Sequence, residues 1–375
     1  MEEFLRKLYR RYLKFEKQSF IIDAKKHSTS LKRMKLSDKI LFEFYDNYYK
    51  IPFLSFLENV KTIIYSKSVF DFITKELSED WDLWRYLKFM TDEKIIKVSK
   101  TGRVFLLKKE IEEIIPKPQT SQEIKRKLER KLNIKIKEKE PVINLFEKFQ
   151  DFSVKAKWDQ MPISAESAIF IVEKILKHIS KNKKFLFVGD DDFISVILTL
   201  VEPNIECLVI DIDKELISCI NNLASRFSLK IQAKEVDIRK QKFLGEKFVG
   251  FLTNPVYTEA GVKKSLMFAK NHLGKDGGIG FLEVGDEAIG KRFLFLQEFF
   301  AKNNLIIDEL ITNKIYYPHI MLYKEDKEIF KRLSSMINKK IIRKSPKLGA
   351  SLYIFEYIPF KPKKIKLKKS IYAYL

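Results

Sequence analysis

Short apolar runs that end at a glycine or a carboxylate recur through the second half of the chain, separated by amphipathic segments. The first run, Phe185–Val188, is followed by Gly189 and the apolar segment Phe193–Leu200, which predicts a buried strand, a tight turn and a helix. Further strands are predicted at residues 205–212, 231–238, 248–258, 277–285, 304–311 and 351–358. Their alternation with helical patterns predicts an α/β domain on a seven-stranded, doubly wound sheet, with the last two strands as an antiparallel edge.

A different order of elements precedes this domain. Residues 68–77 and 81–91 are predicted to be helices, and two short strands flank a hairpin turn at residues 100–103. Two helices followed by a two-stranded wing are typical of a winged-helix domain, an α+β fold that often binds DNA through its second helix. Because that helix is largely apolar here, we favour packing in a core or a dimer contact over insertion into a groove.

Composition then divides the chain into four parts. Residues 1–115 form the N-terminal helical and winged-helix domain, and residues 142–360 form the α/β domain. Between them, residues 116–141 are rich in lysine and bounded by prolines, which predicts a solvated helix and linker. Residues 361–375 are expected to be a flexible basic tail.

The net charge of +22 has two interpretations: affinity for a polyanion such as nucleic acid, or the lysine enrichment of a heat-adapted protein. Apolar runs fall short of the ~20 residues that a membrane span needs, and the N-terminus does not resemble a signal peptide. We therefore expect a cytoplasmic protein without membrane contact. The two cysteines lack metal-binding spacing, and none of the four histidines lies in a strand-end loop with a matching carboxylate, so neither a metal site nor histidine catalysis is expected.

Candidate chemistry begins at the first strand–helix turn, where Asp190, Asp191 and Asp192 follow Gly189. In doubly wound folds a ligand binds at this turn, which is usually rich in glycine so that backbone N–H groups can receive an anion. Three adjacent carboxylates repel one another unless they share a cation, so the turn indicates a positively charged ligand. One of the three is expected to cap the following helix, which is the alternative role for this residue type.

Polar residues also end the other predicted parallel strands. Asp211 lies about 20 residues after Gly189, the spacing of a carboxylate that binds ribose hydroxyls; helix capping is its alternative role, which suits Asp213 better. The remaining strand-end residues are Asp237, the loop Asn254-Pro255-Val256-Tyr257, and Glu283. Because the carboxyl ends of parallel strands share one edge of a sheet, these side chains are expected to surround one ligand.

This arrangement resembles the methyltransferase-like, Rossmann-like fold that binds S-adenosylmethionine, in which Asp237 would contact the exocyclic amine of adenine. The loop after the fourth strand resembles that of enzymes that alkylate amino or amide nitrogens, with Val256 replacing a second proline. S-adenosylmethionine presents a carboxylate and an ammonium to the first turn, whereas its decarboxylated form presents only the ammonium. Aspartates there would repel the first and bind the second, which favours aminopropyl transfer over methyl transfer.

Together, GDDD at residues 189–192, WDQMPIS ahead of it, NPVYT behind it and the winged-helix pattern resemble the branched-chain polyamine synthases, the N4-bis(aminopropyl)spermidine synthases. The resemblance implies two successive transfers of aminopropyl groups from decarboxylated S-adenosylmethionine to the N4 nitrogen of spermidine. Methylthioadenosine leaves each time, and no further cofactor is needed.

The expected roles follow from this chemistry. Asp191 or Asp192 would accept the N4 proton, Tyr257 would hold the amine, and Asn254 would accept its N–H. Asp190, Pro255 and Glu283 would line the polyamine pocket, over which Asp159 and Gln160 would close; Gly189, Asp211 and Asp237 would hold the donor. A homodimer is expected. The alternatives are a nitrogen methyltransferase acting on nucleic acid and a winged-helix regulator that binds DNA without turnover.

Overall fold

The computed structural model describes residues 2–26, 37–48, 53–66, 80–115, 117–149, 152–179, 183–241, 243–318, 331–332 and 348–359. The described residues form two compact units, which divide between Lys117 and Pro118, close to the boundary predicted after residue 115. The second unit ends at Pro359. The tail from residue 361 lies outside the described residues.

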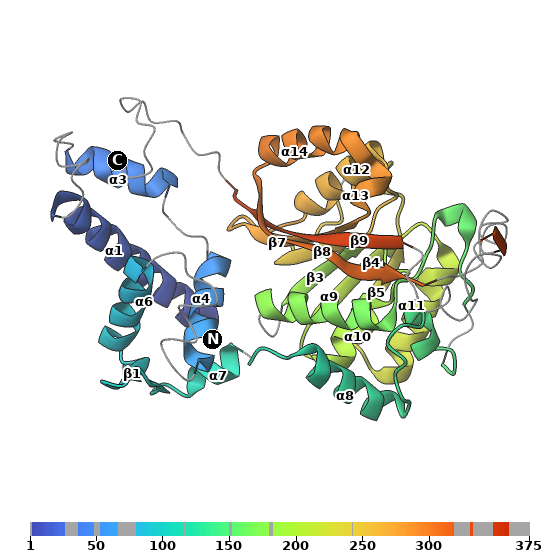
Figure 1. The fold of residues 1–375 in the computed structure, drawn as a ribbon, viewed down its shortest axis with the longest axis horizontal. Helices are drawn as coiled ribbons and strands as arrows, with labels where there is room; N and C mark the ends of the chain where they lie inside the picture. The colour runs from blue at the N-terminus through green and yellow to red at the C-terminus, as the bar shows by residue number, and fades with distance from the viewer. Residues whose placement is uncertain are drawn as a thin grey trace. The chain divides into compact units, whose positions relative to one another are not determined.

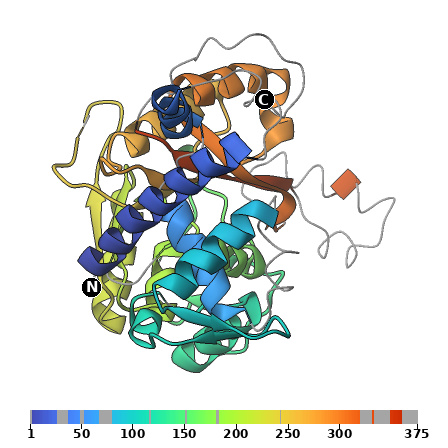
Figure 2. The same ribbon diagram turned by 90° about the vertical axis from the view of Figure 1, so that its left-hand side faces the viewer.

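Helices dominate the N-terminal unit. Helix α1 (Glu2–Lys26) contacts α3 (Asp38–Tyr48), α4 (Phe53–Tyr65) and α6 (Asp80–Asp92). Figure 2 gives a second view of these helices. Strands β1 (Ile96–Val98) and β2 (Val104–Leu106) pair antiparallel, and α7 (Glu110–Ile114) follows. In the core, the rings of Tyr12 and Tyr86 stack at 4.5 Å between centroids. Helix α6 therefore uses its apolar side for packing.

Two of the predicted elements in this unit can be compared with the structure. Helix α6 and the β1–β2 hairpin lie where a helix and a wing were expected. The other expected helix, at residues 68–77, lies outside the described residues, so the winged-helix assignment stays a prediction.

The second unit contains a mixed seven-stranded sheet with the order β5-β4-β3-β6-β7-β9-β8 (Figure 1). Its strands are β3 (Lys184–Val188), β4 (Glu206–Asp211), β5 (Ile231–Glu235), β6 (Gly250–Thr253), β7 (Gly278–Val284), β8 (Leu305–Tyr317) and β9 (Leu348–Tyr357). The first five are parallel, and the last two are antiparallel to their neighbours. This is the methyltransferase-like α/β fold, so the predicted fold class of this unit is confirmed.

Helices cover both faces of the sheet. On one side lie α9 (Ala165–His178), α10 (Ile194–Val201) and α11 (Lys214–Phe227); on the other lie α12 (Glu259–Lys270), α13 (Asp286–Ile289) and α14 (Phe293–Lys302) (Figure 1). All residues of the central strands β6 and β7 are buried as a result. Double coverage explains why these strands read as continuous apolar runs rather than as alternating patterns.

The lysine-rich segment is not a solvated linker, which corrects the interpretation of residues 116–141. Its helix α8 (Ser121–Leu132) buries Ile124, Leu128 and Leu132 and packs against α9 and α10. A capping box of Thr120 and Glu123 begins the helix. The lysines lie around an apolar stripe with a spacing of four residues, so this helix is amphipathic and belongs to the second unit.

No helix in the described part of the chain is both long enough and apolar enough to cross a membrane.

The packing of α8 predicts a loss of stability for Leu128→Ala. Leu128 is fully buried, so truncation is expected to lower the free energy of unfolding by about 2–5 kcal/mol, measured by chemical denaturation. The matched control is Arg126→Ala on the exposed side of the same helix, for which a change within about 0.5 kcal/mol is expected. Equal, small effects of both substitutions would show that α8 does not pack on the sheet unit.

Candidate active site

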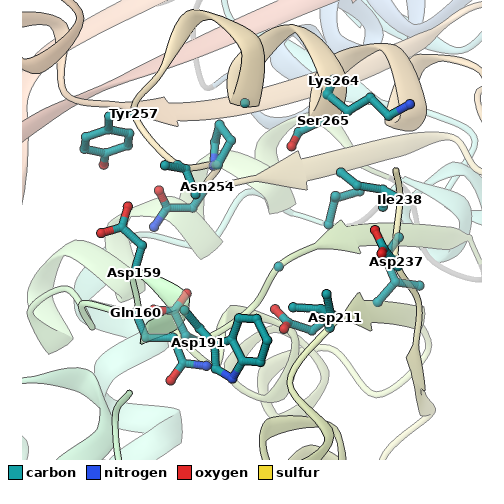
Figure 3. Close-up of a pocket in the computed structure, with 18 of the residues that line it drawn as sticks. Asp159, Gln160, Asp191, Asp211, Asp237, Ile238, Asn254, Tyr257, Lys264 and Ser265 are labelled. Atoms are coloured by element: carbon teal, nitrogen blue, oxygen red, sulfur yellow. The ribbon is translucent and has the colours of Figure 1, made fainter. Parts of the chain in front are cut away.

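A cavity of about 890 Å³ lies at the carboxyl ends of the parallel strands. Nine of the twelve residues proposed from sequence line it: Asp159, Gln160, Gly189, Asp191, Asp211, Asp237, Asn254, Pro255 and Tyr257. Figure 3 shows Asp191 and Asp211 across the cavity from Asn254 and Tyr257. The cavity is large enough for two small ligands, and its polar groups converge from four strand ends.

Gly189 gives the first turn its shape. Its φ of +81° lies in the left-handed region, which is strained for any residue with a side chain. A Cβ atom built there would lie 3.7 Å from the Asn254 carbonyl oxygen and 3.9 Å from Asp211 Oδ2. The glycine therefore lets the chain reverse while keeping open the space between the first, second and fourth strand ends.

Asp190 does not line the cavity, which corrects the expectation that it would bind the polyamine. Its carboxylate accepts hydrogen bonds from the Ile194 N–H at 2.8 Å and from the Ser195 N–H at 3.2 Å. Phe193, at the N-cap position of α10, makes no side-chain capping bond. Asp190 is therefore the carboxylate that satisfies the free N–H groups of this helix.

Asp191 and Asp192 face a different segment. Asp191 accepts the Met161 N–H at 3.0 Å, and Asp192 accepts the Ile163 N–H at 2.8 Å. Burial raises the pKa of both carboxyls well above its usual range; the charge of Asp192 adds to the shift of Asp191, and that of Glu283 to the shift of Asp192. Of the two, only Asp191 lines the cavity.

A third acidic residue, Asp213, also holds the segment before α9. This residue caps α11 and also accepts the Gln160 amide at 2.9 Å and the Lys155 ammonium at 3.0 Å. Gln160 is therefore a buried wall residue whose amide nitrogen is engaged. Asp159, by contrast, is exposed at the cavity and has a φ of +59°.

At the ends of β4 and β5, Asp211 and Asp237 have different electrostatic surroundings. Asp211 accepts the Asp213 N–H at 2.8 Å, and burial raises the pKa of its carboxyl to about 6. Asp237 accepts two hydrogen bonds of 2.8 Å from the Arg239 guanidinium, which hold the pKa of its carboxyl at about 2. Asp237 is thus an ionised acceptor at the cavity wall.

Tyr317 was not among the residues proposed from sequence. Its hydroxyl lies 2.6 Å from that of Tyr257, donates to Glu283, and accepts from Asn254 Nδ2 at 3.2 Å. Strand β8 was expected to end at Ile311, but its pairing with β9 continues to Tyr317 and carries this side chain to the cavity. Glu283 itself is fully buried behind Tyr317 and does not line the cavity, another departure from expectation.

Among the described residues, no group of three or more His, Cys, Asp or Glu side chains has the arrangement of a metal site. The carboxylates of the first turn instead accept backbone and amide N–H groups.

Residues 146–361 match the family described as the branched-chain polyamine synthase A C-terminal domain, over more than half of the chain. The chain belongs to the branched-chain polyamine synthase family. It is therefore a transferase, and the family suspected from the GDDD and NPVYT motifs is confirmed.

Two crystal structures from Thermus thermophilus resemble this chain, both at 16% identity over 84% of this chain and 90% of the other. They are a branched-chain polyamine synthase and its C9 mutein, each in complex with N4-aminopropylspermidine and 5'-methylthioadenosine, with TM-scores of 0.47 and 0.48. An uncharacterised protein of Methanocaldococcus jannaschii is 33% identical over 139 residues, 36% of this chain. The match spans only 35% of that protein's length.

Because Asp190 caps α10, its substitution is expected to lower the stability of the protein. Asp190→Ala leaves the Ile194 and Ser195 N–H groups without their acceptor, so the free energy of unfolding is expected to fall by about 1–3 kcal/mol in chemical denaturation. Asp190→Asn keeps one acceptor oxygen, so its free energy of unfolding is expected to fall by less than that of Asp190→Ala. An Asp190→Ala protein as stable as the parent would contradict the capping role.

Proposed function

We propose that this member of the branched-chain polyamine synthase family moves aminopropyl groups from decarboxylated S-adenosylmethionine to the N4 nitrogen of spermidine. Two transfers give N4-bis(aminopropyl)spermidine and two molecules of methylthioadenosine. The observation that carries the proposal is Asp191, a carboxylate that lines the cavity at the turn where nucleotide-binding folds usually present glycine. This position suits a donor that ends in an ammonium and disfavours one that also carries a carboxylate.

The donor's nucleoside would lie along the first three strand ends. Asp211 would accept hydrogen bonds from the ribose hydroxyls, and Asp237 would accept one from the adenine amine. Gly189 would let the sulfonium group approach the backbone closely. Each of these three residues lines the cavity, which supports one continuous donor site.

The acceptor would enter beside Asn254, Pro255 and Tyr257, under Asp159. A polyamine is a polycation, so the site needs carboxylates that offset the +22 field of the protein. Tyr257 would hold the amine by contact with its ring, and Asn254 would orient it. The N4 lone pair attacks the carbon next to the sulfonium, the C–S bond breaks, and its electron pair stays on sulfur.

Asp191 is the better candidate for the base, because it lines the cavity and Asp192 does not. It would remove a proton from the N4 ammonium of spermidine, so that a neutral secondary amine attacks the donor. Burial raises the pKa of the Asp191 carboxyl well above its usual range, which gives it the proton affinity that a general base needs.

For the N-terminal unit, we propose a winged-helix domain in which α6 and the β1–β2 wing serve packing and a homodimer contact. Tyr86, Phe89 and Met90 of α6 are buried in the core of this unit, which supports the packing role over base reading in a DNA groove.

A direct assay tests the proposed reaction. The purified protein is incubated with spermidine and either decarboxylated or ordinary S-adenosylmethionine, and the products are analysed by mass spectrometry. We expect spermidine to gain the mass of one and of two aminopropyl units with the decarboxylated donor, and neither gain with ordinary S-adenosylmethionine. A methylated amine, or methylation of nucleic acid, would favour the methyltransferase; no turnover together with salt-dependent DNA binding would favour the regulator.

The role of Asp191 predicts that Asp191→Asn lowers kcat for aminopropyl transfer by about 10²–10⁴-fold, because the amide cannot accept the N4 proton. The matched control is Asp276→Asn, an exposed position in the turn before β7, for which unchanged kcat is expected. Initial rates at saturating spermidine provide the comparison. If Asp191→Asn kept the parent kcat, Asp191 would not be the base.

A further inference from the structure

A chain of hydroxyl groups leads from the cavity to a buried carboxylate. Tyr257 and Tyr317 line the cavity with their hydroxyls 2.6 Å apart, and the Tyr317 hydroxyl donates to Glu283. The three residues come from the loop after β6, the end of β8 and the end of β7. Their side chains thus link the ends of the adjacent strands β6 and β7 to the end of β8, which lies beyond β9 in the sheet.

The hydrogen-bond count allows two proton arrangements. Asn254 Nδ2 donates to the Tyr317 oxygen at 3.2 Å, which leaves that oxygen one further bond to accept and one to donate. With Glu283 ionised, Tyr257 donates to Tyr317 and Tyr317 donates to Glu283. With Glu283 protonated on Oε1, the oxygen that contacts Tyr317, every bond in the chain reverses. The two arrangements differ by one proton moved between the cavity and Glu283.

Glu283 is placed to hold such a proton. Its side chain is fully buried, and its Oε2 atom has no hydrogen-bond partner among the described residues. The titratable groups that face it are Tyr317, Asp191, Asp192 and Tyr257. Burial, and then the charge of Asp191, raise the pKa of the Glu283 carboxyl to about 8. Near neutral pH the carboxyl can therefore both accept and release a proton.

The proposed reaction releases two protons from one nitrogen. N4 of spermidine enters as a secondary ammonium with two N–H bonds and leaves as a quaternary ammonium with none. The first proton must leave before the first attack, and the second must leave the tertiary ammonium before the second attack. Asp191 can take only one of them unless it discharges its proton while the intermediate stays bound.

We propose that Tyr257 and Tyr317 conduct the second proton to Glu283, an inference that rests on the proposed function. The tertiary ammonium gives its proton to the Tyr257 oxygen, Tyr257 passes its own proton to Tyr317, and Tyr317 passes its own to Glu283. The N4 lone pair that this step frees attacks the second donor molecule. Glu283 gains one proton, N4 loses one, and both hydroxyls end neutral.

The test is the ratio of doubly to singly aminopropylated product. In Tyr317→Phe the chain is broken, so the second transfer is expected to slow by about 10²-fold and N4-aminopropylspermidine to accumulate, while the first transfer changes much less. Glu283→Gln, which still accepts the Tyr317 bond but cannot take up a proton, is expected to reproduce this effect. The matched control is Tyr357→Phe. Tyr357 pairs with Gly278 at the start of β7, at the strand ends away from the cavity, so this variant is expected to keep the parent's product ratio.

A pH series separates proton transfer from positioning. The rate of the second transfer in Tyr317→Phe is expected to approach the parent rate between about pH 8 and pH 10. At higher pH a growing share of N4-aminopropylspermidine binds with its N4 already neutral, so the proton route is needed less. In the parent, the second transfer is expected to slow as pH falls through about 8, where Glu283 becomes protonated. Glu283→Gln is expected to lose this dependence.

Each outcome has a distinct meaning. If the parent protein transfers no aminopropyl group, the proposed function fails and the proton route fails with it. If the parent makes both products and neither variant alters their ratio, the proton route alone is overturned. If the variants slow both transfers by the same factor at every pH, Tyr317 and Glu283 position the substrate and do not conduct a proton, which also overturns the proposal.

Discussion

The packing of three consecutive carboxylates into one turn, with Asp190 and Asp192 buried and Asp191 partly buried, is the constraint on which the site depends. Adjacent buried charges are costly unless each has its own partners. Asp190 is satisfied by the first N–H groups of α10, Asp191 by Met161, and Asp192 by Ile163 and Asn254. Only Asp191 among them lines the cavity, so one carboxylate is presented to the ligand and two stabilise the turn.

These bonds also connect the two halves of the site. The loop before α9 is tied to the first turn through Met161 and Ile163, and to α11 through Gln160 and Asp213. Asn254 donates to both Asp192 and Tyr317, so the loop after β6 is attached to the same turn. A cation bound at Asp191 would therefore lie where the loop before α9 and the loop after β6 meet the first turn.

Much of this arrangement could be predicted from sequence, because buried parallel strands are apolar runs and their polar end residues share an edge. The sequence pattern could not show that Asp190 has a different role from Asp191 and Asp192, because the difference lies in which N–H groups each carboxylate accepts. Tyr317 depended on how far β8 pairs with β9, a non-local property. The four-residue spacing of Ile124, Leu128 and Leu132 is the pattern of a packed helix, whereas the lysine content of the same segment predicted a solvated one. In the structure the apolar stripe is buried.

The proposed reaction requires that the Asp191 turn select a donor with an ammonium and no carboxylate. Calorimetric titration of the protein, in the absence of acceptor, with decarboxylated and with ordinary S-adenosylmethionine measures this selectivity. The decarboxylated donor is expected to bind at least about tenfold more tightly, because its ammonium favours the ionised form of the Asp191 carboxyl, whereas the ordinary donor also brings its own carboxylate toward that acidic group. Equal affinity, or tighter binding of ordinary S-adenosylmethionine, would contradict the claim.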